Sequence, residues 1–141
     1  MKKNLFDTLT GQIFKKGKKL KILSIINKAL FIVSNKTGLS VNEIMHFLAD
    51  KLGSLIETKT IRLRKNVHIV PFPLTSSRRF YLIAKNIVSV INSNNSKISL
   101  QDKIVEEFFS LIKNKQSKSL ERKEKIIKEA IKNKANVHFR W

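Results

Sequence analysis

The chain has 141 residues, of which 42% are hydrophobic, so it can form one domain with its own core and is not composed like a disordered polypeptide. Its 29 Lys and Arg against 10 Asp and Glu give a formal net charge of +19. A compact domain with this charge repels itself unless a polyanion such as nucleic acid or an anionic membrane neutralises it. The absence of cysteine excludes disulfides, thiolate zinc sites and a cysteine nucleophile.

Helical periodicity of the hydrophobic residues dominates the chain after its first dozen residues. The pattern predicts helices within residues 18–37, 40–56, 76–93, 99–115 and 119–135. Gly38 is expected to end the first of these helices, and Ser40 with Glu43 has the capping-box spacing of a helix start. The predicted fold class is mainly α, a single helical-bundle domain of about five to six helices that spans residues 1–141, with a basic helix and tail at 119–141.

Within residues 57–73, the first run alternates its side chains between two faces, which is the period of a β-strand, and a second β-rich run, VHIVPFP, follows after a short break around Lys65 and Asn66. This pattern predicts a β-hairpin that protrudes from the helices as an arm. Pro71 and Pro73 lack N–H groups on the same side of the second strand, so this strand is expected to be an outer edge. Because a two-stranded ribbon is marginally stable alone, support from outside the domain is expected.

No arrangement of residues indicates catalysis, a metal site or a cofactor. His46, His68 and His138 are scattered and lack metal-ligand spacing with any carboxylate. Glu106 and Glu107 lie within a capped amphipathic helix, where a solvated face is the expected role rather than acid–base catalysis. The glycines stand singly, so the sequence has no phosphate-binding loop. We therefore predict that the chain is not an enzyme.

Basic clusters lie at the starts of two predicted helices. The first cluster precedes or opens the first helix and comprises Lys15, Lys16, Gly17, Lys18 and Lys19. The second is Arg78 and Arg79, in the first turn of the helix after the hairpin. Cations there oppose the helix dipole at a cost of about 0.3–1 kcal/mol each when exposed. A bound phosphate would instead meet free N–H groups, the positive helix end and the basic side chains together.

Three further groups of residues are candidates for contact with nucleic acid. They are Arg62, Arg64 and Lys65 near the hairpin turn, Lys113, Lys115, Lys118 and Arg122 around the loop before the last helix, and His138, Arg140 and Trp141 in the tail. For each basic residue alone, a solvated charge is the alternative. The ring of Trp141 could stack on a base, which is worth about 1–3 kcal/mol, or pack on its own domain.

Several of these segments together resemble the seventh small-subunit ribosomal protein family. The terminal stretch KANVHFRW follows a basic helix, as in members of that family that end near AHYRW or AHFRW. Gly17-Lys18-Lys19, Val70-Pro71 and Arg78-Arg79 fall in the order and spacing of the family, so the resemblance covers residues 9–141. The sequence departs from the family at the hairpin turn, where Arg64 and Lys65 replace paired glycines.

The resemblance implies a helical domain with a protruding hairpin that binds the three-prime major (head) domain of small-subunit rRNA. It also implies neighbouring small-subunit ribosomal proteins as partners, with exit-site tRNA and mRNA near the hairpin. By the same resemblance, Gly17, Lys18, Lys19, Arg78, Arg79, His138 and Arg140 face the RNA. The abundance of Lys, Ile and Asn, which have A/T-rich codons, suggests an organelle genome. A mitochondrial small ribosomal subunit is therefore expected, with a plastid or a bacterial cytoplasm as alternatives.

Two other classes of protein are alternatives. A sequence-specific helical DNA-binding protein would need a recognition helix, and the only candidate, 119–135, has a Lys/Glu mix more typical of a charged surface. A membrane-surface protein would align its basic residues along one amphipathic face, whereas here they gather at loops and helix ends. The longest apolar run, near residues 29–34, is only about a third of a membrane span, so no membrane contact is expected.

Overall fold

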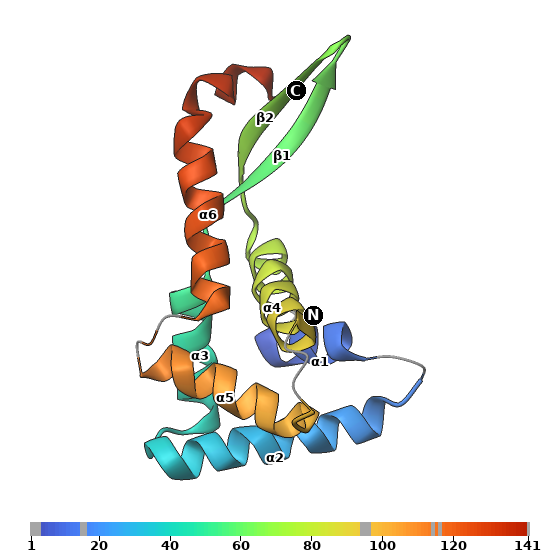
Figure 1. Ribbon diagram of the computed structural model, residues 1–141, viewed down its shortest axis with the longest axis vertical. Coiled ribbons are helices and arrows are strands. Elements are labelled where there is room, and N and C mark those ends of the chain that lie inside the picture. Colours follow the sequence, from blue (N-terminus) through green and yellow to red (C-terminus); the bar gives the residue numbers. More distant parts are fainter. Residues whose placement is uncertain (1–3, 15–16, 94–96, 114, 116, 141) are drawn as a thin grey trace.

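The structure, a computed structural model, describes residues 4–14, 17–93, 97–113, 115 and 117–140 (Figure 1). In chain order the elements are α1 (Leu5–Ile13), α2 (Lys19–Thr37), α3 (Val41–Leu52), β1 (Ile56–Leu63), β2 (Asn66–Pro73), α4 (Ser76–Ser93), α5 (Leu100–Ile112), α6 (Lys118–Lys132) and the 3₁₀-helix η1 (Lys134–Phe139). The predicted fold class, mainly α with one β-hairpin, is confirmed.

The hydrophobic core is built by α1 to α5, which form the broad base of the molecule in Figure 1. Each of these helices presents a stripe of aliphatic side chains to the others, and Phe108 of α5 is the largest side chain that is fully buried. The hairpin and α6 rise from this base side by side and are in contact along β1. The base therefore holds the fold together, while α6 and the hairpin extend away from it.

The first helix, α1, was not expected, because the opening residues are interrupted by polar side chains. Leu5, Leu9 and Ile13 nevertheless recur every four residues and are buried against α4 and α2. The buried hydroxyl of Thr10 donates a hydrogen bond to the carbonyl oxygen of Phe6 at 2.7 Å, so its polarity costs little in this position. The helix is too short for propensity to reveal it, and tertiary burial stabilises it.

The predicted caps at two helix boundaries are confirmed, and α3 is shorter than the segment in which it was predicted. Gly38 ends α2 with a φ of 72°, in the left-handed region that favours glycine. Ser40 and Glu43 form the capping box: the backbone N–H of Ser40 donates to Glu43 Oε2 at 2.7 Å, and the N–H of Glu43 donates to Ser40 Oγ at 3.3 Å. Helix α3 ends at Leu52 rather than continuing to residue 56, because β1 already begins there.

The hairpin pairs β1 with β2 in an antiparallel register that places Ile56 opposite Pro73 and Leu63 opposite Asn66. Its turn consists of two residues, and the first of them, Arg64, has a φ of 54°. A left-handed backbone costs a residue with a Cβ roughly 1–2 kcal/mol. The sequence therefore places an exposed arginine at a strained position where glycine is usual.

Candidate nucleic-acid interface

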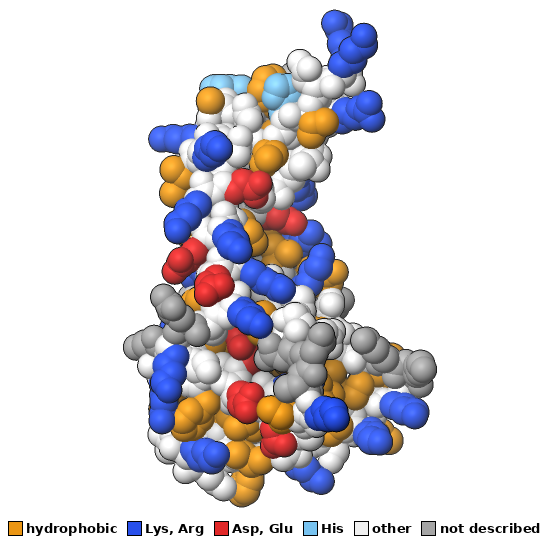
Figure 2. Space-filling view, in the orientation of Figure 1, with side chains coloured by type: hydrophobic (Ala, Val, Ile, Leu, Met, Phe, Trp, Pro, Cys, Tyr) orange, Lys and Arg blue, Asp and Glu red, His pale blue; other side chains and the backbone are white. Residues whose placement is uncertain are grey.

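The Lys and Arg side chains are distributed over the whole length of the molecule. Figure 2 shows them at the hairpin tip, along α6 and around the helical base; acidic side chains lie among them along α6 and on the base but not at the hairpin tip. Three of the basic groups predicted from the sequence lie at separate places: the start of α2, the hairpin tip and the loop between α5 and α6 (Figure 1). They do not converge on one pocket, so a ligand that touches all three must be extended.

The start of α2 retains the features of an anion-binding site. Lys18 is the N-cap residue and makes no side-chain capping bond, and the first turn contains no acidic residue. Gly17 has a φ of 75°, which lets the chain turn into the helix. Gly17, Lys18 and Lys19 are all exposed, whereas Lys15 and Lys16 lie outside the described residues. The positive end of the helix and two ammonium groups thus face solvent together.

The hairpin tip and the loop between α5 and α6 present the other two outward-facing groups. Arg62, Arg64 and Lys65 are exposed around the two-residue turn. The loop group is placed less uniformly, since Lys113, Lys115 and Lys118 are exposed while Arg122 is half-buried on α6. Both groups lie at the ends of secondary-structure elements, where long side chains can reach a ligand without moving the backbone.

Arg78 forms an intramolecular ion pair with Glu57 across the base of the hairpin. Its Nη2 donates to Glu57 Oε1 at 2.6 Å and its Nε donates to Oε2 at 3.1 Å, a bidentate geometry. The Arg78 side chain is 46% exposed, and its guanidinium also lies over the ring of Tyr81 at 5.1 Å. The hydrogen bond from Arg78 lowers the pKa of the Glu57 carboxyl below its ordinary value.

Arg79 points into the protein, toward the carboxyl end of α3. Its Nη2 donates to the carbonyl oxygen of Ala49 at 3.5 Å, while its buried Nε has no hydrogen-bond partner. Gly53 makes room for the guanidinium, because a Cβ there would lie 2.3 Å from both Arg79 Nε and Nη2. Sequence reasoning expected Arg79 at an outward phosphate site and missed Gly53, whose role depends on this long-range contact.

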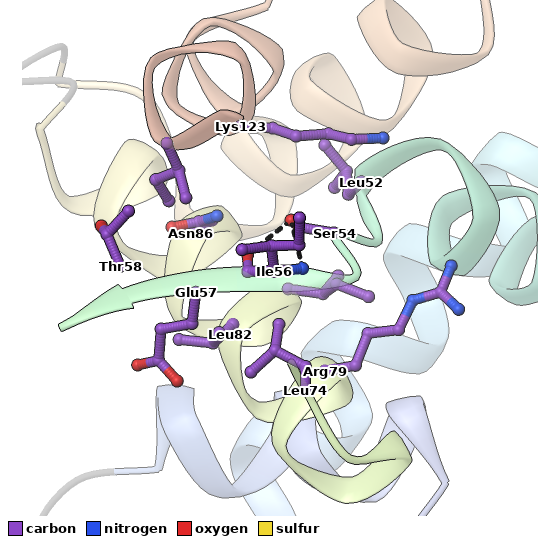
Figure 3. A pocket seen from close by; sticks show the side chains of 12 residues that line it. Leu52, Ser54, Ile56, Glu57, Thr58, Leu74, Arg79, Leu82, Asn86 and Lys123 are labelled. Atoms are coloured by element: carbon purple, nitrogen blue, oxygen red, sulfur yellow. Dashed lines mark hydrogen bonds between the residues drawn. The ribbon is translucent and has the colours of Figure 1, made fainter. Parts of the chain in front are cut away.

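Lys123 of α6 is directed to the same helix end and donates to the carbonyl oxygen of Lys51 at 2.6 Å. In Figure 3, the guanidinium of Arg79 and the ammonium of Lys123 both point toward α3, at one end of a pocket of about 140 Å³. Glu57 lies on another side of this pocket. Burial, with a contribution from Arg79, lowers the pKa of Lys123. Cations at the carboxyl end of a helix interact favourably with its dipole and can bind carbonyl groups of its last turn, so Arg79 and Lys123 cap α3.

The C-terminal tail is held against the outer edge of β2. Arg140 Nε donates to the carbonyl oxygen of Pro71 at 2.7 Å, and Asn136 Nδ2 donates to that of Ile69 at 3.0 Å. The rings of Phe139 and His68 stack with centroids 4.6 Å apart. The tail therefore covers the edge on which the prolines lack N–H groups.

The hairpin thus gains support from its own chain, whereas the sequence suggested support from outside. His138 is exposed, and Trp141 lies outside the described residues. Asn136, Phe139 and His68 were missed as members of this contact; the edge strand marked by Pro71 and Pro73 was the available signal.

The expectation that both Glu106 and Glu107 are solvated is wrong for Glu107. Glu106 is exposed, but Glu107 is buried and accepts a 2.6 Å hydrogen bond from the buried hydroxyl of Ser119. This bond joins α5 to the first turn of α6. Within the described part of the chain, no cluster of His, Asp or Glu could hold a metal ion, and no helix is long and apolar enough to cross a membrane.

Comparison with known proteins identifies the group to which this sequence is similar. The profile of the family described as "Ribosomal protein S7p/S5e" matches residues 1–134. Proteins named "Small ribosomal subunit protein uS7" are similar over most of their length. That of Fervidobacterium nodosum is 27% identical over 137 residues, which cover 97% of this chain and 87% of the relative. Those of Metamycoplasma arthritidis and Clostridioides difficile are 26% and 29% identical, each over 94% of this chain and 84% of the relative.

Loss of the tail contacts should loosen the hairpin. The double variant Asn136→Ala and Arg140→Ala removes two hydrogen bonds to β2, each worth about 0.5–1.5 kcal/mol. Hydrogen–deuterium exchange of residues 66–73 should become roughly tenfold faster, while exchange in α2 stays unchanged. Lys134→Ala, which removes an exposed side chain from the same 3₁₀-helix, serves as the control. Equal exchange in the two variants would show that the tail does not hold the hairpin.

The ion pair between Arg78 and Glu57 should be visible in a carboxyl titration. Because the pKa of Glu57 is lowered in the folded protein, the pair contributes stability above the pKa of the unfolded chain, and this contribution is lost as pH falls through the folded value. Arg78→Gln should raise the titration midpoint of Glu57, followed by NMR of its carboxyl carbon. Lys85→Gln, which removes a weaker contributor, should move it less. Equal midpoints in wild type and Arg78→Gln would contradict the assignment.

Proposed function

The chain belongs to the ribosomal protein S7p/S5e family, and from this premise we propose that it is a structural constituent of the small ribosomal subunit. It acts in translation as a binding protein, not as an enzyme. Its role is to bind and organise the three-prime major domain of small-subunit rRNA, the RNA of the subunit head. The whole chain, 1–141, serves as one rRNA-binding unit, with the hairpin arm at 57–73 and the basic helix and tail at 119–141.

The separation of the basic groups on a rigid frame is the observation that carries this proposal. The start of α2, the hairpin tip and the α5–α6 loop lie at different corners of the molecule and are joined through packed helices (Figure 1). RNA segments bound at these points would be held in a fixed relative orientation. Contacts to phosphates fix position without reading sequence, which suits a protein that organises a folded RNA.

The predicted RNA-facing residues divide into three groups. Lys18, Lys19, the three basic residues at the hairpin tip and Lys113, Lys115 and Lys118 of the α5–α6 loop are exposed and can bind phosphate directly, whereas Arg122 is half-buried. Lys15, Lys16, His138 and Trp141 remain proposed contacts on the strength of the sequence pattern. Arg79 and Arg140 bind backbone carbonyl groups, so their part in RNA binding is to hold α3 and the tail in position.

Arg78 is partly exposed, like the outward-facing residues, and is also bound within the protein, like Arg79 and Arg140. Its side chain is 46% exposed and its guanidinium is bound to a single carboxylate, and a phosphate placed at the start of α4 could replace or share that carboxylate. Arg78 is therefore proposed as a phosphate ligand that is held in position by Glu57 before RNA arrives. Such preorganisation lowers the side-chain entropy lost on binding.

The hairpin arm is the proposed contact region for further partners. Its tip is the part of the molecule most distant from the core, and its strained turn presents Arg64 and Lys65 to solvent (Figure 2). We propose that this tip lies near exit-site tRNA and mRNA, and that exposed apolar residues elsewhere meet neighbouring ribosomal proteins. The Lys-, Ile- and Asn-rich composition supports a mitochondrial ribosome, although the relatives named above are bacterial.

Competition binding distinguishes an rRNA-binding protein from a DNA-binding one. The full chain should bind the three-prime major domain RNA, and an excess of duplex DNA of equal length should displace it poorly. Replacing Lys113 and Lys115 with Gln should weaken RNA binding, because two phosphate contacts are lost. Lys125→Gln is the control, since Glu121 and Glu129 lie one helical turn away on either side and balance its charge. Stronger retention of duplex DNA than of rRNA would contradict the proposal.

A further inference from the structure

A hollow near the carboxyl ends of α2 and α5 contains an aromatic ring surrounded by lysines. Its volume is about 470 Å³, and it is lined by Lys36 of α2, by Val105, Glu106, Phe109 and Ser110 of α5, and by Lys113 and Lys115 beyond α5. This volume is within the range of small-molecule sites in proteins. Phe109 is half-buried, so one part of its ring is packed on the core and another part faces the hollow.

Two ammonium groups lie close to the Phe109 ring. Lys113 Nζ is 4.4 Å and Lys36 Nζ is 5.8 Å from the ring centroid. Neither lysine, nor Lys115, forms an ion pair with any carboxylate among the described residues. Lysines at helix carboxyl ends are stabilised by the helix dipole, which explains why they are tolerated there. It does not explain why two of them lie over one half-buried ring and a third lines the same hollow.

Glu106 restricts what the hollow can bind. It lies one turn before Phe109 on the same face of α5, and its exposed carboxylate lines the same hollow. A ligand that carried only negative charge, such as an acidic peptide, would pair with the lysines but leave this carboxylate without a hydrogen-bond donor. A ligand that pairs an anion with a flat ring bearing N–H donors would instead contact every side of the hollow. Its anion would pair with the lysines, its ring would stack on Phe109, and its donors would hydrogen-bond to Glu106.

We propose that this hollow, the Phe109 site, binds one unpaired nucleotide of the RNA. The base stacks on Phe109 in place of the Lys113 ammonium, and the displaced lysine joins Lys36 and Lys115 on the flanking phosphates. The Glu106 carboxylate accepts a hydrogen bond from an exocyclic amino group, as acidic side chains do from N4 of cytosine. The site therefore prefers cytidine to uridine. This inference rests on the proposed RNA-binding function and adds a specific contact to it.

Nucleotide titration of the full chain tests the site directly. In ¹H–¹⁵N NMR spectra, cytidine 5′-monophosphate should produce saturable shifts at the amides of Phe109, Ser110 and Lys113. Uridine 5′-monophosphate and ribose 5-phosphate should bind more weakly. Phe109→Leu keeps the apolar bulk and removes the aromatic face, so it should weaken cytidine 5′-monophosphate binding by about tenfold, within the range expected for a lost stacking contact. Phe31→Leu, at an exposed phenylalanine of α2 outside the hollow, is the matched control.

Two further measurements test the role of Glu106 and whether RNA occupies the Phe109 site. Glu106→Ala should reduce the preference for cytidine over uridine to about one, since the amino-group acceptor is lost. Saturating three-prime major domain RNA should abolish the nucleotide-induced shifts, because RNA occupies the site. Undiminished nucleotide binding in the presence of bound RNA would overturn the proposal.

The results separate this inference from the proposed function. Equal binding of cytidine 5′-monophosphate and ribose 5-phosphate would reject the Phe109 site. Equal affinities of Phe109→Leu and Phe31→Leu for cytidine 5′-monophosphate would reject it as well. In both cases, rRNA binding by the wild-type chain would leave the proposed function intact. Failure of the wild-type chain to bind rRNA would reject the proposed function itself. Shifts confined to residues outside α5 would also reject the site.

Discussion

The shortage of carboxylates is the constraint on which the rest of this structure depends. The chain has only 10 Asp and Glu for 29 Lys and Arg, and several of the acidic groups bind hydroxyl and backbone groups within the fold. Glu43 caps α3, Asp102 accepts from Ser99 at the start of α5, and Glu107 is buried against Ser119. Glu129 accepts a hydrogen bond from Thr58 of the hairpin. Acidic groups used in this way position helices and strands and leave most of the positive charge unbalanced.

The positive charge itself is divided between internal and external uses. Arg79, Lys123 and Arg140 donate to backbone carbonyl groups, two at the end of α3 and one on the edge of β2. These bonds fix the position of α6, the tail and the hairpin relative to the helical base. The cations at the start of α2, the hairpin tip and the α5–α6 loop are then presented at fixed separations. Internal capping by some cations thus determines where the others are exposed to solvent.

The sequence allowed the main elements to be predicted, because their signals are local. The capping box at Ser40, the αL glycine at position 38 and the period-two pattern of the hairpin each lie within a few neighbouring residues. Helix α1 was missed because it is short and is stabilised by burial against α4, a contact that no local pattern encodes.

The candidate site was harder to predict, because its residues are assigned by contacts across the chain. The basic clusters were recognised from their positions at helix ends and loops. Whether an arginine faces outward depends on distant partners: Glu57 for Arg78, Gly53 and Ala49 for Arg79, and Pro71 for Arg140. The sequence also gave no reason to connect Lys36 with Phe109, which lie on different helices and meet only in the fold.

The salt dependence of RNA binding tests the central claim most directly, because counterions are released for each phosphate that the protein neutralises. The equilibrium binding constant of the full chain for the three-prime major domain RNA should be measured between about 50 and 200 mM monovalent salt, the range over which many phosphate contacts lower affinity steeply. The logarithm of that constant should fall steeply and linearly with the logarithm of salt concentration. A nearly flat response would contradict it.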